Sequence, residues 1–398
     1  MRVYLDFNAT TPVDPAVLAA MTPYFSAEFG NASSIHSAGQ RARSSVEHAR
    51  ESVAKLLGAK PAEIVFTGSG TEASNLAILG TIAPGATKRH VITTAIEHHA
   101  VLHSCAALEA RHVHQASEVT YVGAGHDGVV DPENIRRALR PDTALITVMH
   151  ANNEIGTIQP IEEIGKIARE AGVFFHTDAV QSAGKIPVNV DRLGVDLLSI
   201  AAHKFYGPKG VGALYVRSGV PVAPILYGGH HERDRRPGTE NVPGIVGLGK
   251  AAELVAHHLL LDSEKIGALR DRFEQALLEK IPNCSINGYR GLRIPNTTNF
   301  TFANAVGESL QIGLDLQGVA CSTGAACSSG AIEPSHVLSA IGLSHDHANG
   351  SLRFSLGHAT TGAEIDFALS VIPGVVERLR ELSPMQTQAP QPKAAAVR

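Results

Sequence analysis

The sequence feature that most restricts the fold is a repeated pattern that begins near Glu63. Short apolar runs alternate with helix-type segments, and new runs begin at Glu63, His90, Ala144 and Val173. Such alternation is typical of an α/β fold whose sheet has mostly parallel strands. Ligands of open α/β sheets bind beyond the carboxyl ends of the strands. We therefore expect functional residues where these apolar runs end.

Lys204 follows the apolar run 195–202 and precedes a turn rich in glycine and proline. The run predicts a buried strand, which would deliver the lysine to the functional edge of the sheet. Desolvation favours the neutral amine, the form that attacks a carbonyl carbon and holds it as a Schiff base. A lysine that extends to solvent or pairs with a carboxylate fits this stretch equally well. Other residues at this edge of the sheet must decide between these interpretations of Lys204.

The strand-to-helix connection at residues 67–72 has the features of an anion site. Ser69 and Glu72 have the spacing of a capping box that opens a helix. Backbone amides at a helix start bind phosphate, and Gly70 and Thr71 stand at this start. A plain connection without a ligand is the alternative. The segment matches neither the Walker pattern nor the dinucleotide glycine pattern, which argues against nucleoside triphosphate or NAD.

Polar residues also end the runs that follow. His98 and Asn153 stand after two of them, and Asp178, followed by Gln181, ends another. A strand-terminal aspartate upstream of a strand-terminal lysine is the arrangement of pyridoxal-phosphate enzymes, in which the carboxylate keeps the pyridine nitrogen protonated. His98 would stack on a flat ring or move protons. A structural hydrogen-bonding role is the alternative for this histidine.

A glycine-framed loop at residues 227–241 is dense in basic side chains. Thr239 and the arginines of this loop would bind a phosphate or a carboxylate. A solvated charged loop is an equally good interpretation.

Beyond this loop, a helical pattern from Pro243 to about Lys280 leads into a second region with strand-type runs at 297–302 and 351–356. The segment 320–330 consists of small and polar residues and contains Cys327, so we expect a mobile loop there. Cys321, nearer an apolar run, is expected to be structural.

The chain is expected to form two domains. We predict a large cofactor-binding domain at residues 16–255 and a smaller α+β domain at residues 256–384 that contains the cysteine loop. Residues 1–15 are expected to form an N-terminal segment that packs with the smaller domain. The tail at residues 385–398 is rich in Gln, Pro and Ala and is predicted to be disordered.

Composition excludes several classes of function. The 398 residues have a formal net charge of −4 and no block of basic residues, so neither nucleic acid nor a membrane surface is expected as a partner. The first residues lack the apolar core of a signal peptide, and a cytoplasmic location is the default expectation. Four cysteines stand too far apart for a disulfide framework or a four-cysteine zinc site, and no intrinsic metal is expected.

These motifs together resemble a known family. They are GTE at 70–72, EH at 97–98, NNEIG at 152–156, DAVQ at 178–181, HK at 203–204, RPGTEN at 236–241 and STGAACSS at 322–329. In order and spacing they are similar to the cysteine desulfurases of the NifS/IscS class, over residues 4–384. The resemblance implies a fold-type I, class V aminotransferase-like enzyme, with a large, mostly parallel-sheet domain and a smaller α+β domain.

The resemblance also implies the cofactor, pyridoxal 5'-phosphate, and the role of each site residue. Lys204 would hold the cofactor covalently, and Cys327 would accept the sulfur of L-cysteine as a persulfide while L-alanine leaves. The remaining roles would be ring contacts by Asp178, Gln181 and His98; phosphate contacts by Gly70, Thr71 and His203, with Thr239 from the other subunit of a homodimer; and substrate carboxylate contacts by Asn153 and Arg353. The expected partner is a sulfur acceptor or iron–sulfur scaffold protein, with Cys327 as a transient cluster ligand.

Some positions differ from the family's usual pattern. Ala201 stands where relatives commonly have a phosphate-binding serine, and Ser199 or the helix amides would have to compensate. Thr323 and Ala325 replace serines of the cysteine loop. The chain end lacks the ending of IscS proteins that dock a scaffold there, and the basic loop is closer to the nitrogen-fixation branch.

Iron–sulfur cluster assembly is therefore the expected pathway, and nitrogenase supply or tRNA thiolation stay open. A selenocysteine lyase, another class V lyase or aminotransferase, and a non-catalytic partner protein of the same fold are the alternatives.

Overall fold

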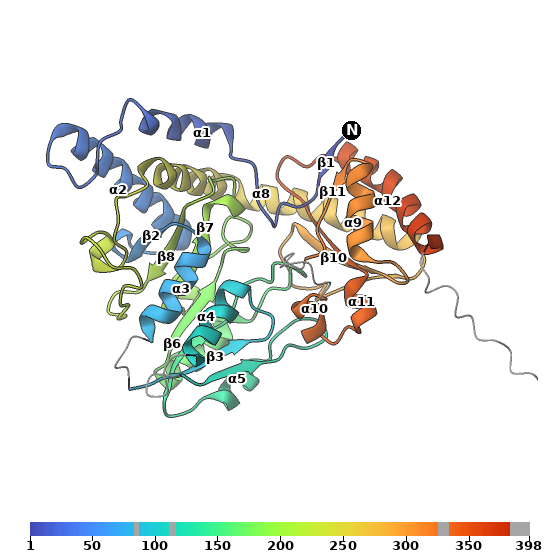
Figure 1. Ribbon diagram of the computed structural model, residues 1–398, viewed down its shortest axis with the longest axis horizontal. Helices are drawn as coiled ribbons and strands as arrows, with labels where there is room; N and C mark the ends of the chain where they lie inside the picture. Colours follow the sequence, from blue (N-terminus) through green and yellow to red (C-terminus); the bar gives the residue numbers. More distant parts are fainter. Residues whose placement is uncertain (83–86, 111–116, 325–333, 383–398) are drawn as a thin grey trace, which may run out of the picture.

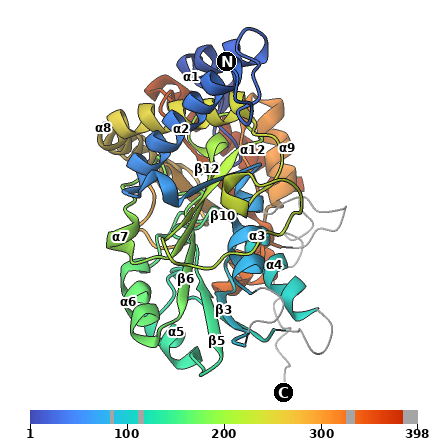
Figure 2. The same cartoon turned by 90° about the vertical axis from the view of Figure 1, so that its left-hand side faces the viewer.

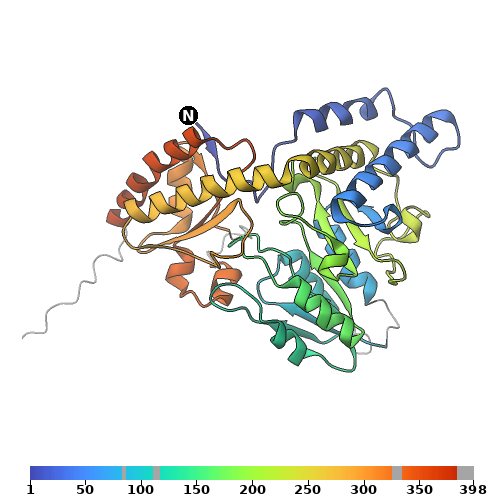
Figure 3. The same cartoon turned by 180° about the vertical axis from the view of Figure 1, so that it is seen from behind.

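The computed structural model describes residues 1–82, 87–110, 117–324 and 334–382. Two bodies stand side by side, one around a large sheet and one around a small sheet (Figure 1). The long helix α8 (Val242–Lys280) runs through both of them (Figure 3). This helix confirms the helical pattern predicted through Lys280.

The large sheet has seven strands in the order β2-β8-β7-β6-β5-β3-β4. Their bounds are β2 (Ile64–Thr67), β3 (His90–Thr94), β4 (Val119–Val122), β5 (Thr143–Thr147), β6 (Phe174–Asp178), β7 (Leu197–Ala201) and β8 (Gly212–Val216). Strands β3 to β7 pair in parallel, whereas β8 is antiparallel to both of its neighbours. The predicted α/β sheet with mostly parallel strands is confirmed.

Helices cover both faces of this sheet, which is why its inner strands are buried almost throughout. Successive residues point to opposite faces, so Leu197 packs in one core and Leu198 in the other. Figure 2 shows α3 and α4 on one side of the sheet and α6 on the other. The helices are α1 (Pro15–Met21), α2 (Ser37–Leu57), α3 (Gly70–Thr81), α4 (His99–Glu109), α5 (Pro132–Ala138), α6 (Ile161–Ala171) and α7 (Val190–Leu193).

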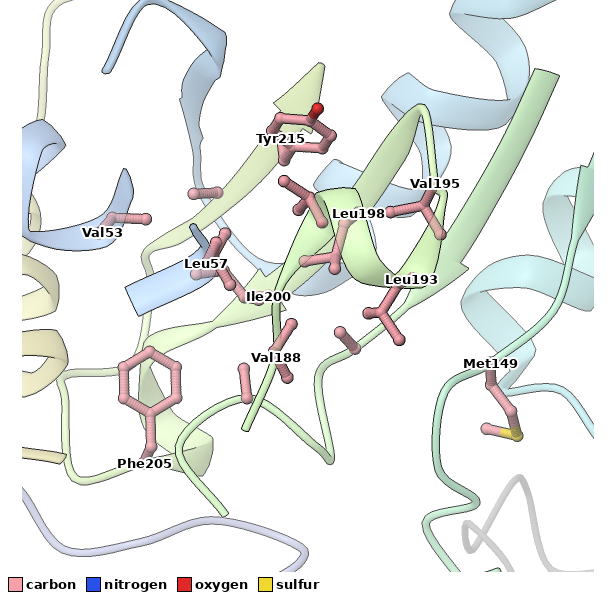
Figure 4. Packing of buried hydrophobic residues seen from close by; sticks show 14 of the residues in the cluster. Val53, Leu57, Met149, Val188, Leu193, Val195, Leu198, Ile200, Phe205 and Tyr215 are labelled. Carbon is pink, nitrogen blue, oxygen red and sulfur yellow. The ribbon is translucent and has the colours of Figure 1, made fainter. Parts of the chain in front are cut away.

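The core between the sheet and α2 packs directly behind the end of β7. Leu198 and Ile200 of β7 lie with Leu57 of α2 and with Phe205, which follows the strand (Figure 4). All residues of β7 are buried. This packing fixes where the strand ends and thus where Lys204 emerges.

The smaller body is built on an antiparallel sheet in the order β12-β10-β9. Its elements are β9 (Cys284–Ile286), β10 (Thr297–Phe302), β12 (Ser351–Ser355), α9 (Gly307–Leu316) and α12 (Gly362–Leu382), with β1 (Val3–Tyr4) paired in parallel to β11 (Val319–Ala320). Phe273, Phe300 and Phe354 form its core. Val3 and Leu5 belong to the same core, whereas Thr11 and Val13 of the predicted N-terminal segment contact the large body.

Helix α8 joins the two bodies without a break. Leu248 and Ala252 near its start lie in the core of the large sheet, whereas Ile266 and Phe273 lie in the core of the smaller body. The predicted boundary at residues 255/256 falls between these two groups. By length and composition the helix could span a membrane; apolar residues toward its two ends pack into the two protein cores, whereas Leu260 and Leu261 between them are exposed.

One segment of the predicted smaller domain packs elsewhere. Helices α10 (His336–Ala340) and α11 (His345–Asn349) place Val337, Leu338 and Ala348 in the core of the large sheet. The hydrophobic pattern shows that these residues are buried but not against which body, so a single boundary in the sequence could not represent this arrangement.

Candidate functional site

A cavity of about 80 Å³ lies beyond the carboxyl ends of β6 and β7. Residues from five separate segments of the sequence line it: Ser69, Gly70, Thr71, His98, Asn153, Asp178, Gln181, Ala201 and His203. Lys204 follows directly and lines a second cavity of about 30 Å³. The structure thus brings together most of the predicted site residues at the edge of the sheet where they are expected.

The start of α3 forms one end of the larger cavity. Ser69 caps the helix by accepting a hydrogen bond from the amide of Glu72 at 3.1 Å. The Glu72 carboxylate accepts from the amide of Gly68 at 2.7 Å, one residue before the position that a capping box would use. A Cβ on Gly70 would lie 2.8 Å from Val180, which follows β6, and 3.2 Å from Ala201 of β7, so glycine lets the helix start approach both strand ends closely. Free amides at this start suit a phosphate.

The basic loop at residues 227–241 contacts this helix start from outside. Arg236 donates from Nε to the Glu72 carboxylate at 2.8 Å, so this arginine is already paired. Thr239 is exposed and does not line the cavity of its own chain. Its predicted contact with the phosphate of a partner subunit stays a prediction.

Ala201 offers only a methyl group to the cavity. Ser199 does not replace the missing serine, because it is fully buried in β7 and its Oγ is hydrogen-bonded to Nε2 of His176 at 2.9 Å. The sequence offered Ser199 or the helix amides as a replacement for the missing phosphate-binding serine, and only the helix amides remain.

Asp178 ends β6 with its carboxylate at the cavity. One oxygen accepts from the amide of Val180 at 2.9 Å. Burial raises the pKa of Asp178 to about 6, and the Val180 amide and Lys204 oppose that shift. The carboxylate is therefore charged at neutral pH, and a cation such as a protonated ring nitrogen would stabilise that charge further.

Lys204 stands at the end of a short 3-10 turn, Ala202–Lys204, directly after β7. Its Nζ donates to the backbone oxygens of Asn8 and Ala9 at 2.7 and 2.8 Å. Burial lowers the pKa of Lys204 to about 8; Arg353 adds to that shift, and Asp178 opposes it. An amine of this kind is neutral in a useful fraction of molecules near neutral pH.

His98 caps α4 and borders the cavity. Its Nδ1 accepts from the amide of Ala100 at 3.0 Å. Burial, followed by the charge of Lys204, lowers the pKa of His98 to about 4, so the ring is neutral. A neutral imidazole that accepts at Nδ1 has its proton on Nε2, and in this state the ring is a flat surface with one donor.

Arg353 of β12 reaches the site from the smaller body. Its Nη1 donates to the backbone oxygen of Asn153 at 3.0 Å, and its Nη2 donates to Asp6 at 2.7 Å. In the described part of the chain, Nε of Arg353 and Oδ1 of Asn153 are buried and have no hydrogen-bond partner. A buried donor and a buried acceptor without partners, on two residues that are hydrogen-bonded to each other, indicate that a ligand completes this corner.

Cys327 lies outside the described residues. The chain is fixed just before it, because Ser322 and Arg353 exchange backbone hydrogen bonds at 2.6 and 3.2 Å. Gly324 lies against the carboxylate of Glu154. Cys321 is buried, and burial raises the pKa of its thiol, which fits the structural role expected of it.

Two site residues were missed by sequence reasoning. Asn8 contacts Lys204 and Asn153, and Lys185 contacts both Asn8 and Gln181. The only signal in the sequence is the position of Lys185 four residues after Gln181. Among the residues that the structure describes, no group of three or more His, Cys, Asp or Glu is arranged to hold a metal ion.

The residues fit pyridoxal phosphate. The start of α3 would bind the phosphate, and the buried carboxylate of Asp178 would face the ring nitrogen. A neutral imidazole borders the same cavity, and a lysine of lowered pKa lies next to it. The fold and the site thus define a pyridoxal-phosphate enzyme of the class V aminotransferase type. Residues 3–367 match the family described as Aminotransferase class-V.

Proteins of similar sequence indicate which group within this class the chain belongs to. A "Cysteine desulfurase IscS" of Dictyoglomus turgidum is 51% identical over 388 residues, which covers 97% of this chain and 98% of that protein. A "Cysteine desulfurase" of Nostoc sp. is 52% identical over 384 residues, or 96% and 95% of the two chains. The chain belongs to the cysteine desulfurases of the NifS/IscS class.

Solved structures of similar fold point to the same family. A "NIFS-LIKE PROTEIN" superposes with a TM-score of 0.88 at 40% identity, covering 95% of this chain and all (100%) of that one. The structure described as "SspA in complex with cysteine" has a TM-score of 0.79 at 39% identity and covers 91% of this chain and 100% of that one. The predicted family, fold class, cofactor and enzymatic nature are confirmed.

Proposed function

We propose that this protein removes sulfur from L-cysteine, releases L-alanine, and holds the sulfur as a persulfide on Cys327 before it passes to iron–sulfur cluster assembly. The observation that carries the proposal is the meeting of Lys204, Asp178 and the start of α3 at one edge of the sheet. Family membership supplies the reaction class. When bound, pyridoxal phosphate supplies an electron sink for the charge that develops on the substrate α carbon.

Lys204 has two tasks in this reaction. It would hold the cofactor through Nζ, and as a free neutral amine it would remove the proton from the substrate α carbon. A pKa of about 8 suits both tasks, because the amine is then close to the working pH. Asp178 keeps the ring nitrogen protonated, which a charged, buried carboxylate does well.

Asn153 and Arg353 would bind the substrate carboxylate. Nε of Arg353 is a buried donor without a partner in the described part of the chain, and the arginine supplies the positive charge, whereas Asn153 would donate from its side-chain NH2. Held there, the substrate would have its α carbon near Lys204. The alignment of reacting groups is worth several orders of magnitude in rate.

Cys327 would complete the reaction as a thiolate. Its sulfur forms a bond to the substrate sulfur while the bond from that sulfur to the β carbon breaks, and the carbon retains the electron pair. Protonation of the carbon fragment gives alanine. His98, with its proton on Nε2, is a donor at this point rather than an acceptor.

Assembly and location are further parts of the proposal. A homodimer would bring Thr239 to the partner's phosphate site, which accounts for its exposure here. A cytoplasmic location and an iron–sulfur scaffold as acceptor, with Cys327 as a transient cluster ligand, are included in the proposal, and the name IscS of two relatives supports only the link to iron–sulfur cluster assembly.

The test is to measure alanine and sulfide released from L-cysteine by the holoenzyme and by its Cys327→Ala variant. We expect the variant to lose most sulfide release while it keeps the cofactor absorption band. Undiminished sulfide release would refute the persulfide step and favour a lyase that does not need this cysteine, such as a selenocysteine lyase. A protein that shows no cofactor band after pyridoxal phosphate is added would refute catalysis.

A further inference from the structure

A second lysine stands beside the reaction lysine and has no part in the proposed function. Lys185 and Lys204 line the same cavity of about 30 Å³. Nζ of Lys185 donates to Oε1 of Gln181 at 2.6 Å and to Oδ1 of Asn8 at 2.9 Å. A buried lysine without a carboxylate partner costs stability, so we expect this amine to have a role that offsets the cost.

The backbone around Lys185 is fixed. Gly184 adopts a φ of +76°, and a Cβ there would lie 2.6 Å from Phe205. This tight turn directs the chain back toward Gln181. The backbone oxygen of Lys185 also accepts from Oγ of Ser263, on α8, at 2.6 Å. The amine position is therefore determined by the fold rather than by a free side chain.

Lys185 determines which end of the Gln181 amide faces the cofactor cavity. Because Oε1 of Gln181 accepts from Lys185, the NH2 group is the opposite end, and one of its hydrogens goes to the backbone oxygen of Asn8 at 3.0 Å. A primary amide has a second N–H, and Gln181 borders the cavity. The backbone oxygen of Asn8 favours the same orientation, and without Lys185 this one contact would be left to oppose a flip that turns the carbonyl inward.

Asn8 makes the arrangement rigid. Its backbone oxygen accepts from both Lys204 and Gln181, and its side-chain oxygen accepts from both Lys185 and Asn296. The backbone oxygen and the side-chain oxygen of one asparagine thus connect the two lysines. A connected polar network of this kind holds each member in one orientation.

We propose that Lys185 is a positioning residue that holds the Gln181 carboxamide with an N–H toward the ring oxygen of pyridoxal phosphate. The proposal rests on the proposed function, because it assigns Gln181 to that oxygen. A donor on the ring oxygen stabilises negative charge there. It therefore lowers the pH at which the lysine-bound cofactor loses its proton.

The charged groups around Lys185 favour its neutral form. Burial lowers the pKa of Lys185 well below its ordinary value, and the charges of Lys204 and Arg353 act in the same direction. Asp262 of α8 lines the same cavity. A neutral amine still has two N–H donors for Gln181 and Asn8, so the positioning role does not need a charge.

The test is a pH titration of the cofactor absorption band in the holoenzyme without cysteine. We expect Lys185→Met to raise the midpoint by about one pH unit, the effect of one lost hydrogen bond to a charged group. Gln181→Leu should raise it similarly, and the double variant should show no further shift. Lys265→Met, which removes an exposed lysine outside the network, should leave the midpoint unchanged.

An unshifted midpoint in Lys185→Met would overturn the proposal if Gln181→Leu shifts it, and so would single shifts that add in the double variant. Should Lys185→Met not accumulate as folded holoenzyme, Lys185→Gln is used in the same cycle, because its shorter side chain cannot reach Gln181. The titration is carried out without cysteine. A wild-type band that titrates as expected therefore leaves the proposed function standing even if the Lys185 variants show no shift. A wild-type protein without that band would refute both proposals.

Discussion

Lys204 should attach the cofactor at a rate that rises with pH up to about pH 8 and then levels off. The neutral amine is the reacting form. With a pKa of about 8 it makes up roughly one molecule in eleven at pH 7, against roughly one in 3,000 for the ordinary value of 10.5. The structure thus predicts a rate advantage of roughly 300-fold at neutral pH over an exposed lysine.

The assay is stopped-flow absorbance after cofactor-free protein is mixed with pyridoxal phosphate between pH 6 and pH 10. The Arg353→Met variant removes the charge that, after burial, most lowers the pKa of Lys204. We expect its curve to move to higher pH. Lys204→Ala gives the background without the covalent band. A rate that continues to rise about tenfold per pH unit up to pH 10 would show that the amine is not desolvated, and the reasoning would fail.

Two further predictions concern stability. Arg50 forms a buried, two-point ion pair with Glu232 at 2.8 Å, so Glu232→Ala should lose about 3 kcal/mol in urea unfolding followed by circular dichroism. Glu170→Ala, from an exposed pair, is the control that should change nothing measurable; equal losses would contradict the role of burial. His176 is buried and neutral, and burial lowers its pKa to about 3, so its stabilisation should be lost progressively as the pH falls from 6.5 toward 3. Replacing His176 by Gln should flatten the acid limb of the unfolding curve, and an unchanged limb would contradict this.

Much of the site could be predicted because it depends on local patterns. Asp178 ends the buried strand β6 and Lys204 follows the buried strand β7 by one short turn, and parallel strands end at the same edge. Their proximity follows from the sheet alone. Gly70 and Thr71 follow similarly from a strand-to-helix turn.

The missed residues depend on contacts between distant parts of the chain. Asn8 bonds to Lys185 across 177 positions and to Lys204 across 196. Neither residue stands in a pattern that differs from an ordinary surface loop. The predicted compensation by Ser199 failed for the same reason, since its partner His176 belongs to the neighbouring strand. The pairing of Arg236 with Glu72, across 164 positions, could not be anticipated either.

Helix α8 limits how this enzyme can move. Its 39 residues form one element roughly 58 Å long at 1.5 Å per residue. It packs into both cores and is continuous between them, so a hinge motion between the two bodies would have to bend or unwind this helix. Arg353 comes from one body and Lys204 from the other, so the continuous helix should keep the distance between them nearly constant during the reaction. The freedom that catalysis requires must then reside in loops, and substrate capture should proceed without a large change in the overall dimensions of the protein.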